Sequence, residues 1–386
     1  MLRGLTLSTL FPDRSRPRFG PFVERQTLEL AAHPDVELRV MAPVGLPPWP
    51  LSRVEHYAAL SALPARENWQ GLDVSRPRFL HLPATDGRFD ATMLARTLLP
   101  QLRRLREQFS FDVIDAEFFF PDGPAAIALG KALGVPVSIK ARGSDIHLWG
   151  QRPATRAQVV SAGKAADGVL AVSAALKSDM IAMGMPAERI RVHHTGVDLD
   201  LFQPVDRLKE KFALGISGPL VVSVGTLSTR KGQGLLIDAL VAMPGTSLVL
   251  IGAGPDRAAF ERQATLRGVA SHVRFAGSLD HSEIARWLGA ADAMALPSVS
   301  EGLANVWVEA LACGTPIVIT DVGGAREVVD SPIAGHIVAA DPQAIADAIQ
   351  DLIANPRDAA AVRRVAERFT WQANTDALYA HLKSLI

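Results

Sequence analysis

The chain has 386 residues, of which 48% are hydrophobic, and this is enough for two hydrophobic cores of ordinary size, so two domains are predicted. Forty basic and forty acidic residues cancel, which argues against nucleic acid as the main partner. The single cysteine, Cys313, excludes a disulfide framework and favours a reducing compartment.

Signals for membrane insertion or export are weak. No apolar run approaches the length of about 18 residues that a spanning helix needs. The apolar run within residues 1–12 is too short for a signal peptide and is predicted to be a first strand. We therefore expect a cytoplasmic protein that is soluble or peripheral on the inner face of the plasma membrane.

Strand and helix signals alternate along the first half of the chain, which is typical of parallel α/β proteins. Strands are predicted at 2–10, 36–41, 112–115, 135–139, 169–172 and 190–193. Helices are predicted to end near residue 32 and to occupy 94–109, 123–133 and 174–183. These elements predict one parallel sheet with helices between successive strands.

Local signals set several boundaries in this half. Gly134 is expected to end the helix at 123–133, and Ser173 is placed to cap the helix that follows it. Pro100 is expected to kink the helix at 94–109 or to mark a restart. Residues 43–80 are rich in Pro, Trp and Arg and show little periodicity, so a long irregular insertion is predicted there.

The second half repeats the alternation, and the two halves meet near residue 203. Its strands are predicted at 220–225, 247–252, 273–275, 294–296, 316–320 and 337–338. Its helices are predicted at 235–243, 284–290, 305–312, 345–354 and 369–385. The sequence therefore indicates a second parallel α/β domain of similar design.

The stretch 296–318 carries the strongest functional signal. A Gly-containing loop leads into a helix near Asn305, and backbone amides at a helix N-terminus bind anions. Two acids, Glu301 in the loop and Glu309 about two turns later, would repel a bare phosphate. Carboxylates accept paired hydroxyl hydrogen bonds, so the combination suits a nucleotide sugar. The alternative is a surface loop with two solvated glutamates.

A basic turn follows the first strand of this second half. Arg230 and Lys231 lie after a predicted strand and before a helix, where fixed cations suit a diphosphate. The alternative is a solvated basic turn. After the next strand, Gly252 and Gly254 begin a dinucleotide-like pattern, but Arg257 stands where its third glycine belongs. A nicotinamide dehydrogenase is therefore disfavoured.

Taken together, SEGLANVWVEALACGTPIVIT and the following DVGGAREVV resemble the donor-binding signature of GT4-type retaining glycosyltransferases. This resemblance implies the GT-B fold, in which two Rossmann-like α/β domains face each other across a deep cleft. It implies an acceptor-binding domain at 1–203 and a nucleotide-sugar donor-binding domain at 204–368. It also implies that a C-terminal helix at 369–386 crosses back to the first domain.

The same resemblance assigns roles in the donor site. Glu309 would bind the ribose, Lys231 the diphosphate and Glu301 the sugar. The remaining implied donor contacts are the following: Gly20, Arg230, Gly252, Ser278, Leu279, Gly302, Leu303, Ala304 and Asn305. The family usually has Arg where Thr226 stands, so phosphate binding is expected to be weaker unless the neighbouring Arg230 takes over that contact.

In the first domain the resemblance points to Arg142 and Asp145. Many relatives carry His-Gly-x-Asp here, whereas this chain has Arg-Gly-Ser-Asp. Because Arg stays charged, it cannot shuttle a proton, and Arg142 is expected to stabilise phosphate or developing charge. The alternative is a structural pair between Arg142 and Asp145. The adjacent His193 and His194 are expected to pack in a strand, because neighbouring strand residues point to opposite faces.

The expected activity is retaining transfer of a sugar from a nucleotide-diphosphate sugar to an acceptor hydroxyl. Neither a metal nor a cofactor is expected, and the acceptor is a sugar or a lipid-linked sugar of a bacterial envelope polysaccharide or glycolipid. The helix at 94–109 has both apolar and basic residues, which suits core packing or peripheral contact with an anionic membrane. The alternatives are an epimerase of the same fold and a non-catalytic partner subunit.

Overall fold

The computed structural model describes residues 1–17 and 19–386, which form two compact units. The first unit comprises residues 1–195 together with 371–386, and the second comprises residues 196–370. The chain thus enters the second unit at Gly196 and leaves it after Thr370. No helix in these described ranges is long and apolar enough to cross a bilayer.

The first unit is built on an eight-stranded sheet with the order β10-β9-β8-β7-β1-β2-β5-β4. Its strands are β1 (Leu2–Leu7), β2 (Val36–Met41), β4 (Arg66–Trp69), β5 (Leu72–Ser75), β7 (Val113–Ala116), β8 (Val137–Ala141), β9 (Gly168–Ala171) and β10 (Ile190–Val192). All neighbours are parallel except β4, which is antiparallel to β5. The strand order reverses between β1 and β7, where ligands bind in doubly wound folds.

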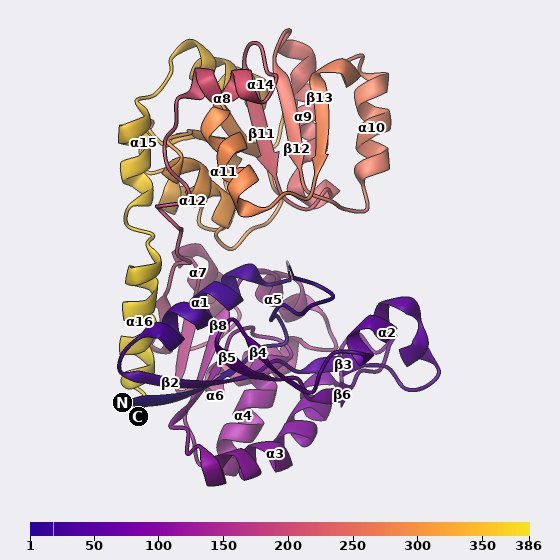
Figure 1. Cartoon of the computed structure of the whole chain (residues 1–386), viewed down its shortest axis with the longest axis vertical. Coiled ribbons are helices and arrows are strands. Elements are labelled where there is room, and N and C mark those ends of the chain that lie inside the picture. The colour runs from indigo at the N-terminus through magenta and orange to yellow at the C-terminus, as the bar shows by residue number, and fades with distance from the viewer. Residues whose placement is uncertain (18) are drawn as a thin grey trace. The chain divides into compact units, whose positions relative to one another are not determined.

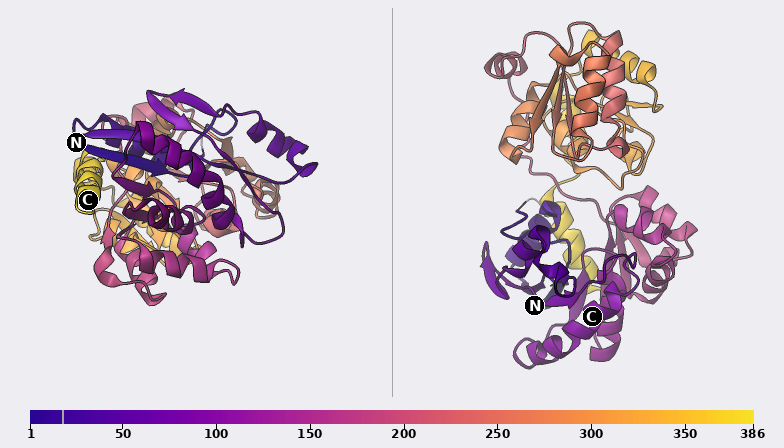
Figure 2. Two further views of the ribbon diagram at one scale, coloured as in Figure 1. Left: turned by 90° about the horizontal axis from the view of Figure 1, so that it is seen from below. Right: turned by 90° about the vertical axis from the view of Figure 1, so that its right-hand side faces the viewer.

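Helices cover both faces of this sheet (Figure 1). They are α1 (Pro21–Ala32), α3 (Asp90–Gln108), α4 (Asp122–Leu133), α5 (Ser144–His147), α6 (Arg156–Ala165), α7 (Ala174–Ala182) and α16 (Trp371–Lys383). Helix α2 (Glu55–Ser61) lies to one side and packs on the short strand at 44–46. Helix α16 packs beside α1, and its Leu378 and Leu382 share a core with Leu2 and Leu30. The predicted return of the C-terminal helix to the first unit is thereby confirmed. Both termini lie at the same end of this unit (Figures 1 and 2).

Two local predictions in this unit are confirmed. Helix α4 ends at Gly134, whose φ of 66° is the left-handed conformation that glycine adopts without a steric cost. Helix α7 begins after Ser173, whose side chain accepts a hydrogen bond from the Leu176 amide. Both helix ends were therefore recognisable from single residues.

One other prediction in this unit is wrong, and a second is narrowed. Residues 43–80 are not irregular, since they contain β4, β5, α2 and the parallel pair β3 (Val44–Leu46) and β6 (Arg78–Leu80). These elements are too short to produce a clear hydrophobic period. Helix α3 runs as one helix through Pro100, which excludes a restart, and a kink at Pro100 stays a prediction.

The second unit has a six-stranded sheet with the order β13-β12-β11-β14-β15-β16, and its paired neighbours are parallel. The strands are β11 (Leu220–Val224), β12 (Ser247–Ile251), β13 (Val273–Gly277), β14 (Ala293–Leu296), β15 (Ile317–Thr320) and β16 (Gly335–Val338). The order reverses between β11 and β14. The loops after these two strands therefore meet at the position where such sheets bind nucleotides.

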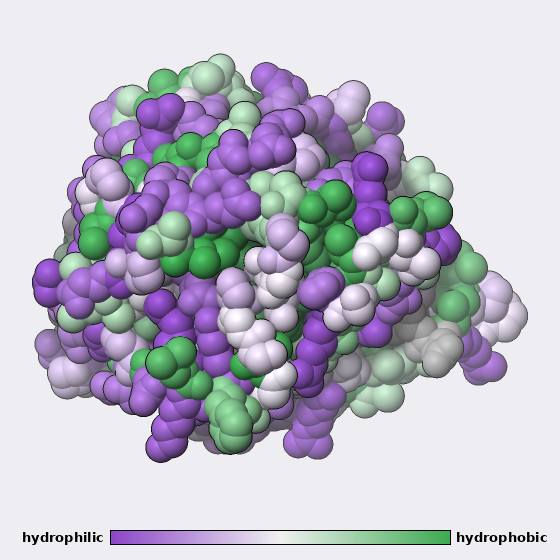
Figure 3. Space-filling view, turned by 90° about the horizontal axis from the view of Figure 1, so that it is seen from above, coloured by the Kyte–Doolittle hydropathy of each residue, from purple (hydrophilic) through white to green (hydrophobic). Residues whose placement is uncertain are grey.

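Eight helices flank this second sheet in the part of the chain that the structure describes. They are α8 (Arg207–Ala213), α9 (Gln233–Ala239), α10 (Arg257–Leu266), α11 (His281–Ala290), α12 (Asn305–Ala312), α13 (Ala325–Val328), α14 (Pro342–Ala354) and α15 (Ala359–Ala366). One core joins alternate strand residues such as Val221 and Leu250 to Leu236 of α9 and Ile349 of α14. On the face shown in Figure 3, hydrophobic residues form small, separate patches among hydrophilic ones.

Candidate functional site

The loops after β11 and β14 meet in the second unit, and they bring Lys231 and Glu301 together. The Lys231 ammonium lies 2.5 Å from Oε1 of Glu301. The backbone fixes this pair, because the Val299 amide donates to the Arg230 carbonyl at 2.8 Å. A Cβ at Gly232 would lie 2.1 Å from the Pro297 carbonyl oxygen, so glycine permits this approach. Two of the predicted site residues are thus in direct contact.

The same turn presents Arg230. Its side chain is exposed, and among residues 1–17 and 19–386 no ion pair engages it. Asp256 holds the preceding residue in place, because its carboxylate accepts from the amide and hydroxyl of Thr229 at 2.6 and 2.8 Å. Thr226 is also exposed. The loop therefore offers an anion the Arg230 cation, as expected if this residue replaces the family's arginine.

Two neighbouring glycine turns lie against each other next to this loop. Gly252, which follows β12, has a φ of 139°, and a Cβ there would lie 2.0 Å from the Gly225 carbonyl oxygen. The predicted base-reading segment, Ser278 and Leu279, follows the edge strand β13. Ser278 is exposed, and the described contacts do not join it to Lys231 or Glu301.

Helix α12 contributes the second acid. Residues 302–304 lead into the helix, the N-cap Ala304 provides no side-chain cap, and the first amides of a helix have no intrahelical acceptor. Glu309 follows on this helix, and within the described residues no side chain donates to its carboxylate. Burial raises the pKa of Glu309 to about 7. A half-buried carboxylate with open acceptor positions suits a ligand that donates hydroxyl hydrogen bonds.

The loop after β15 supports the loop that carries Glu301. The Gly324 amide donates to the Gly302 carbonyl at 2.7 Å. A Cβ at Gly323 would lie 2.4 Å from the carbonyl oxygens of Glu301 and Gly302. The GG of the DVGGAREVV segment therefore shapes the site through close backbone packing.

The first unit contains the other predicted residues. Gly20, with a φ of 68°, is the N-cap of α1, and a Cβ there would lie 2.2 Å from the Leu10 carbonyl oxygen. The ring of Phe22, two residues later, lies 4.9 Å from the Arg142 guanidinium carbon. The structure thus brings the Gly20 turn close to Arg142.

The alternative of a side-chain pair between Arg142 and Asp145 is wrong. Asp145 accepts backbone hydrogen bonds from the amides of Phe119, Arg142 and Gly143 at 2.8 to 2.9 Å. Burial raises the pKa of Asp145, although these amides act in the opposite direction. Asp145 therefore shapes the loop and does not neutralise the guanidinium.

Glu117 is the partner of Arg142, and the sequence reasoning missed it. Arg142 donates from Nε to the Glu117 carbonyl at 2.7 Å and from Nη2 to the Glu117 carboxylate. The sequence did contain a signal for Glu117, because this acid stands one residue after a buried strand. Side chains at the carboxyl ends of neighbouring parallel strands converge, and Ala116 of β7 pairs with Ile139 of β8.

Two further residues, His193 and Cys313, test earlier expectations. His193 lies just beyond β10, buried between the Lys140 ammonium at 2.6 Å from Nδ1 and the Asn374 carbonyl at 2.8 Å from Nε2. Its expected place within a strand is therefore wrong. Cys313 is buried, and burial raises the pKa of its thiol to about 12, which is the behaviour of the packed core thiol that was expected.

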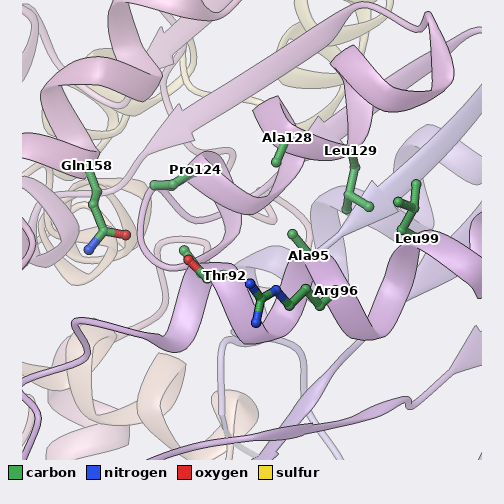
Figure 4. Close-up of a pocket in the computed structure, with 9 residues that line it drawn as sticks. Thr92, Ala95, Arg96, Leu99, Pro124, Ala128, Leu129 and Gln158 are labelled. Carbon is green, nitrogen blue, oxygen red and sulfur yellow. The ribbon is translucent and has the colours of Figure 1, made fainter.

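A mostly aliphatic cavity of about 300 Å³ lies in the first unit between α3 and α4, with Gln158 of α6 at one side (Figure 4). Its lining includes Ala95, Arg96 and Ala128. It contains none of the predicted site residues. We therefore do not include this cavity in the candidate site. In the second unit that site consists of the polar loops after β11 and β14 and the start of α12.

Comparison with known proteins agrees with this arrangement. The family model described as Glycosyltransferase Family 4 matches residues 47–201, and that described as Glycosyl transferases group 1 matches residues 205–369. The chain is 36% identical over 230 residues to a GDP-mannose-dependent alpha-(1-6)-phosphatidylinositol monomannoside mannosyltransferase of Mycolicibacterium smegmatis. It is 36% identical over 219 residues to a D-inositol 3-phosphate glycosyltransferase of Mycobacterium tuberculosis.

These alignments span 55% and 53% of the chain but only 60% and 45% of the two relatives. Among solved structures, the chain resembles Anabaena HepE in complex with UDP, with a TM-score of 0.77 and 20% identity over 100% of both chains. It also resembles sucrose-phosphate synthase from Thermosynechococcus elongatus, with a TM-score of 0.77 and 21% identity over 100% of both chains. The chain belongs to the GT4-type glycosyltransferases and has the GT-B fold.

Proposed function

We propose that this protein transfers a sugar, with retention of configuration and without a bound metal, from a nucleotide-diphosphate sugar to an acceptor hydroxyl. The observation that carries the proposal is the Lys231–Glu301 pair at the switch point of the second sheet. Glu309, with open acceptor positions, follows on the next helix. A cation for phosphate and two acids for hydroxyls make a nucleotide-sugar site.

Each residue of the second unit has a distinct role in this proposal. Lys231 and Arg230 neutralise the diphosphate and the charge that develops on it when the sugar departs. Glu309 accepts hydrogen bonds from the ribose hydroxyls and Glu301 from the sugar. The amides at 302–305 complete these contacts at the start of α12.

The first unit presents the acceptor in the same proposal. Arg142 stabilises phosphate or developing charge, while Asp145 fixes the loop around it through backbone amides. The acceptor hydroxyl attacks on the same face as the departing diphosphate, as the family resemblance implies. No carboxylate is assigned as a covalent nucleophile.

We assign the acceptor to sugars or lipid-linked sugars of bacterial envelope polysaccharide or glycolipid synthesis, met at the cytoplasmic face of the membrane. The support is that one relative is named a phosphatidylinositol monomannoside mannosyltransferase. Helix α3 packs its apolar face on the core and also carries basic residues, which suit contact with an anionic membrane surface. Flotation with anionic vesicles tests the membrane contact, and a protein that stays at the bottom of the gradient refutes it.

Calorimetric titration with UDP, GDP, ADP and NAD, each with and without EDTA, tests the donor site. One nucleoside diphosphate should bind at micromolar concentration irrespective of EDTA. Glu309→Ala should weaken that binding about 100-fold, since two charge-assisted hydrogen bonds to the ribose are lost. Glu261→Ala, on the exposed face of α10, is the matched control and should bind as the wild type does. Binding of NAD alone contradicts the proposal.

Donor binding should also depend on pH through Glu309. Burial raises the pKa of Glu309 to about 7, so the carboxyl group must lose its proton before both oxygens can accept hydroxyl hydrogen bonds. Affinity should therefore be full at pH 8 and fall about tenfold by pH 6. Titrations of Glu309→Gln at both pH values separate this effect from titration of the phosphates. An equal fall in that variant would show that Glu309 is not responsible.

A non-catalytic nucleotide-sugar-binding subunit is the second candidate, because exposed Thr226 stands in place of the family's phosphate-binding arginine. Both candidates bind the nucleotide, but only the transferase turns over the donor. Product analysis with and without acceptor sugars distinguishes transfer from epimerisation. Donor that is bound and recovered intact would favour the subunit.

A further inference from the structure

A buried polar cluster lies at the carboxyl ends of β7 and β8 in the first unit. Arg142 donates to Glu117 twice, from Nε to the main-chain carbonyl at 2.7 Å and from Nη2 to the carboxylate. The side chains of both residues are nearly inaccessible, with 4% exposed for Arg142 and 1% for Glu117. Glu117 therefore holds the guanidinium at Nε through its main chain and at Nη2 through its carboxylate.

One nitrogen of this guanidinium makes no hydrogen bond to the described residues. Nη1 of Arg142 is buried and has no hydrogen-bond partner within residues 1–17 and 19–386. The Phe22 ring lies 4.9 Å from the guanidinium carbon and restricts its movement. A buried charged donor without a partner is costly, so a ligand that supplies an acceptor here gains the missing hydrogen bond.

Glu117 is itself supported from behind. Gln26 of α1 donates to the Glu117 carboxylate and accepts from the Lys140 ammonium. Lys140 in turn lies 2.6 Å from Nδ1 of His193. These contacts link three other segments of the first unit, through Gln26, Lys140 and His193, to the acid that holds Arg142.

The charges in the cluster favour an ionised Glu117. Burial alone would raise the pKa of Glu117, but the positive charges of Arg142 and Lys140 outweigh it and lower that pKa. Burial, followed by the charge of Glu117, raises the pKa of the neighbouring Asp115. Glu117 is thus the acid that balances the guanidinium, because the pKa of Asp115 moves in the opposite direction.

We propose that Glu117 is a positioning residue that orients the Arg142 guanidinium so that Nη1 faces the substrate. A long arginine side chain has many rotamers, and a fixed orientation allows it to stabilise charge without reorganising during the reaction. This proposal rests on the proposed transferase function, since it assigns the reaction that Arg142 serves. It assigns Glu117 no contact with the substrate.

The variant Glu117→Gln retains the shape of the side chain and removes its charge. We expect the turnover number for the nucleotide sugar to fall about 30-fold. Dissociation constants for the nucleoside diphosphate, which binds the second unit, should stay within about twofold. The matched control is Glu67→Gln, which breaks another buried glutamate–arginine pair of the same unit, with Arg76. The control should lose comparable thermal stability but keep its turnover within about threefold.

A double-mutant cycle tests whether the effect acts through Arg142. In an Arg142→Ala background, Glu117→Gln should lower turnover by less than about twofold. Multiplicative losses, or equal losses in Glu117→Gln and Glu67→Gln, would overturn the proposal. If Glu117→Gln does not fold, Gln26→Met removes one support of Glu117, and a turnover loss of about fivefold is expected. An unchanged turnover in that variant would also overturn it.

The proposed function has a separate point of failure. If the wild-type protein turns over none of the nucleotide sugars, the transferase function fails. The role in the reaction then fails with it, and thermal unfolding of the four proteins of the cycle tests only whether Glu117 holds Arg142 in place. Additive losses of Tm for Glu117→Gln and Arg142→Ala would refute it, whereas a smaller combined loss would support the coupling.

Discussion

Lys231→Ala should lower the turnover of the nucleotide-sugar donor about 1,000-fold. Lys231 is the cation that lies 2.5 Å from Glu301, and its side chain is 29% exposed, so it is accessible to a ligand. Its loss removes positive charge where the departing diphosphate becomes more negative. It also leaves the Glu301 carboxylate without its counter-charge and beside the phosphates. Steady-state assays of nucleoside diphosphate release measure the effect.

The control for this variant is Lys209→Ala, a change on the surface helix α8 of the same unit. It should leave turnover within about twofold of the wild type. Lys231→Arg should retain charge but misplace it, and about a tenth of the activity is expected. Wild-type turnover in Lys231→Ala would show that Arg230 alone neutralises the diphosphate.

Gly252→Ala should destabilise the second unit by more than about 3 kcal/mol. A methyl group at this position would lie 2.0 Å from the Gly225 carbonyl oxygen, and the φ of 139° is unfavourable for alanine. The two turns that flank the candidate phosphate site must therefore separate. Urea unfolding followed by circular dichroism measures the loss, with nucleoside diphosphate binding as the functional readout.

Gly268→Ala is the matched control for that substitution. Gly268 has a φ of 72° but no atom within 4 Å of its Cβ position, so only the conformational cost of about 1–2 kcal/mol applies. Equal losses in the two variants would contradict the close packing between the turns. A larger loss for Gly252→Ala, together with weaker nucleotide binding, would support it.

The second unit was the more predictable because its signals are local. The glycine turns, the basic turn at Arg230 and Lys231 and the acids near Asn305 occur within short stretches, and each follows a strand with a clear apolar run. The loops that follow β11 and β14 carry the predicted residues, and the reversal of strand order between these two strands brings the loops together. Short-range patterns are sufficient when the tertiary contact follows from a general rule of parallel sheets.

The first unit shows why other features were missed. A side-chain pair between Arg142 and Asp145 was the alternative interpretation of their spacing, but buried backbone amides donate to the Asp145 carboxylate instead. Glu117 is contacted by Gln26, which is 91 positions away in the chain. The hydrophobic periodicity of the sequence cannot predict this contact, because the contact depends on which helix covers which strand. The strands β3 to β6 were missed since each has only three or four residues.

Helix α16 has a consequence for how the protein is made. Leu378 and Leu382 complete a core that begins with Leu2 and Leu30, yet they emerge from the ribosome after the whole of residues 196–370. The second unit is one continuous segment and can fold during synthesis as soon as it is exposed. The first unit must wait with an uncovered apolar face until residues 371–386 arrive. Translation therefore completes the two units in the reverse of their order along the chain.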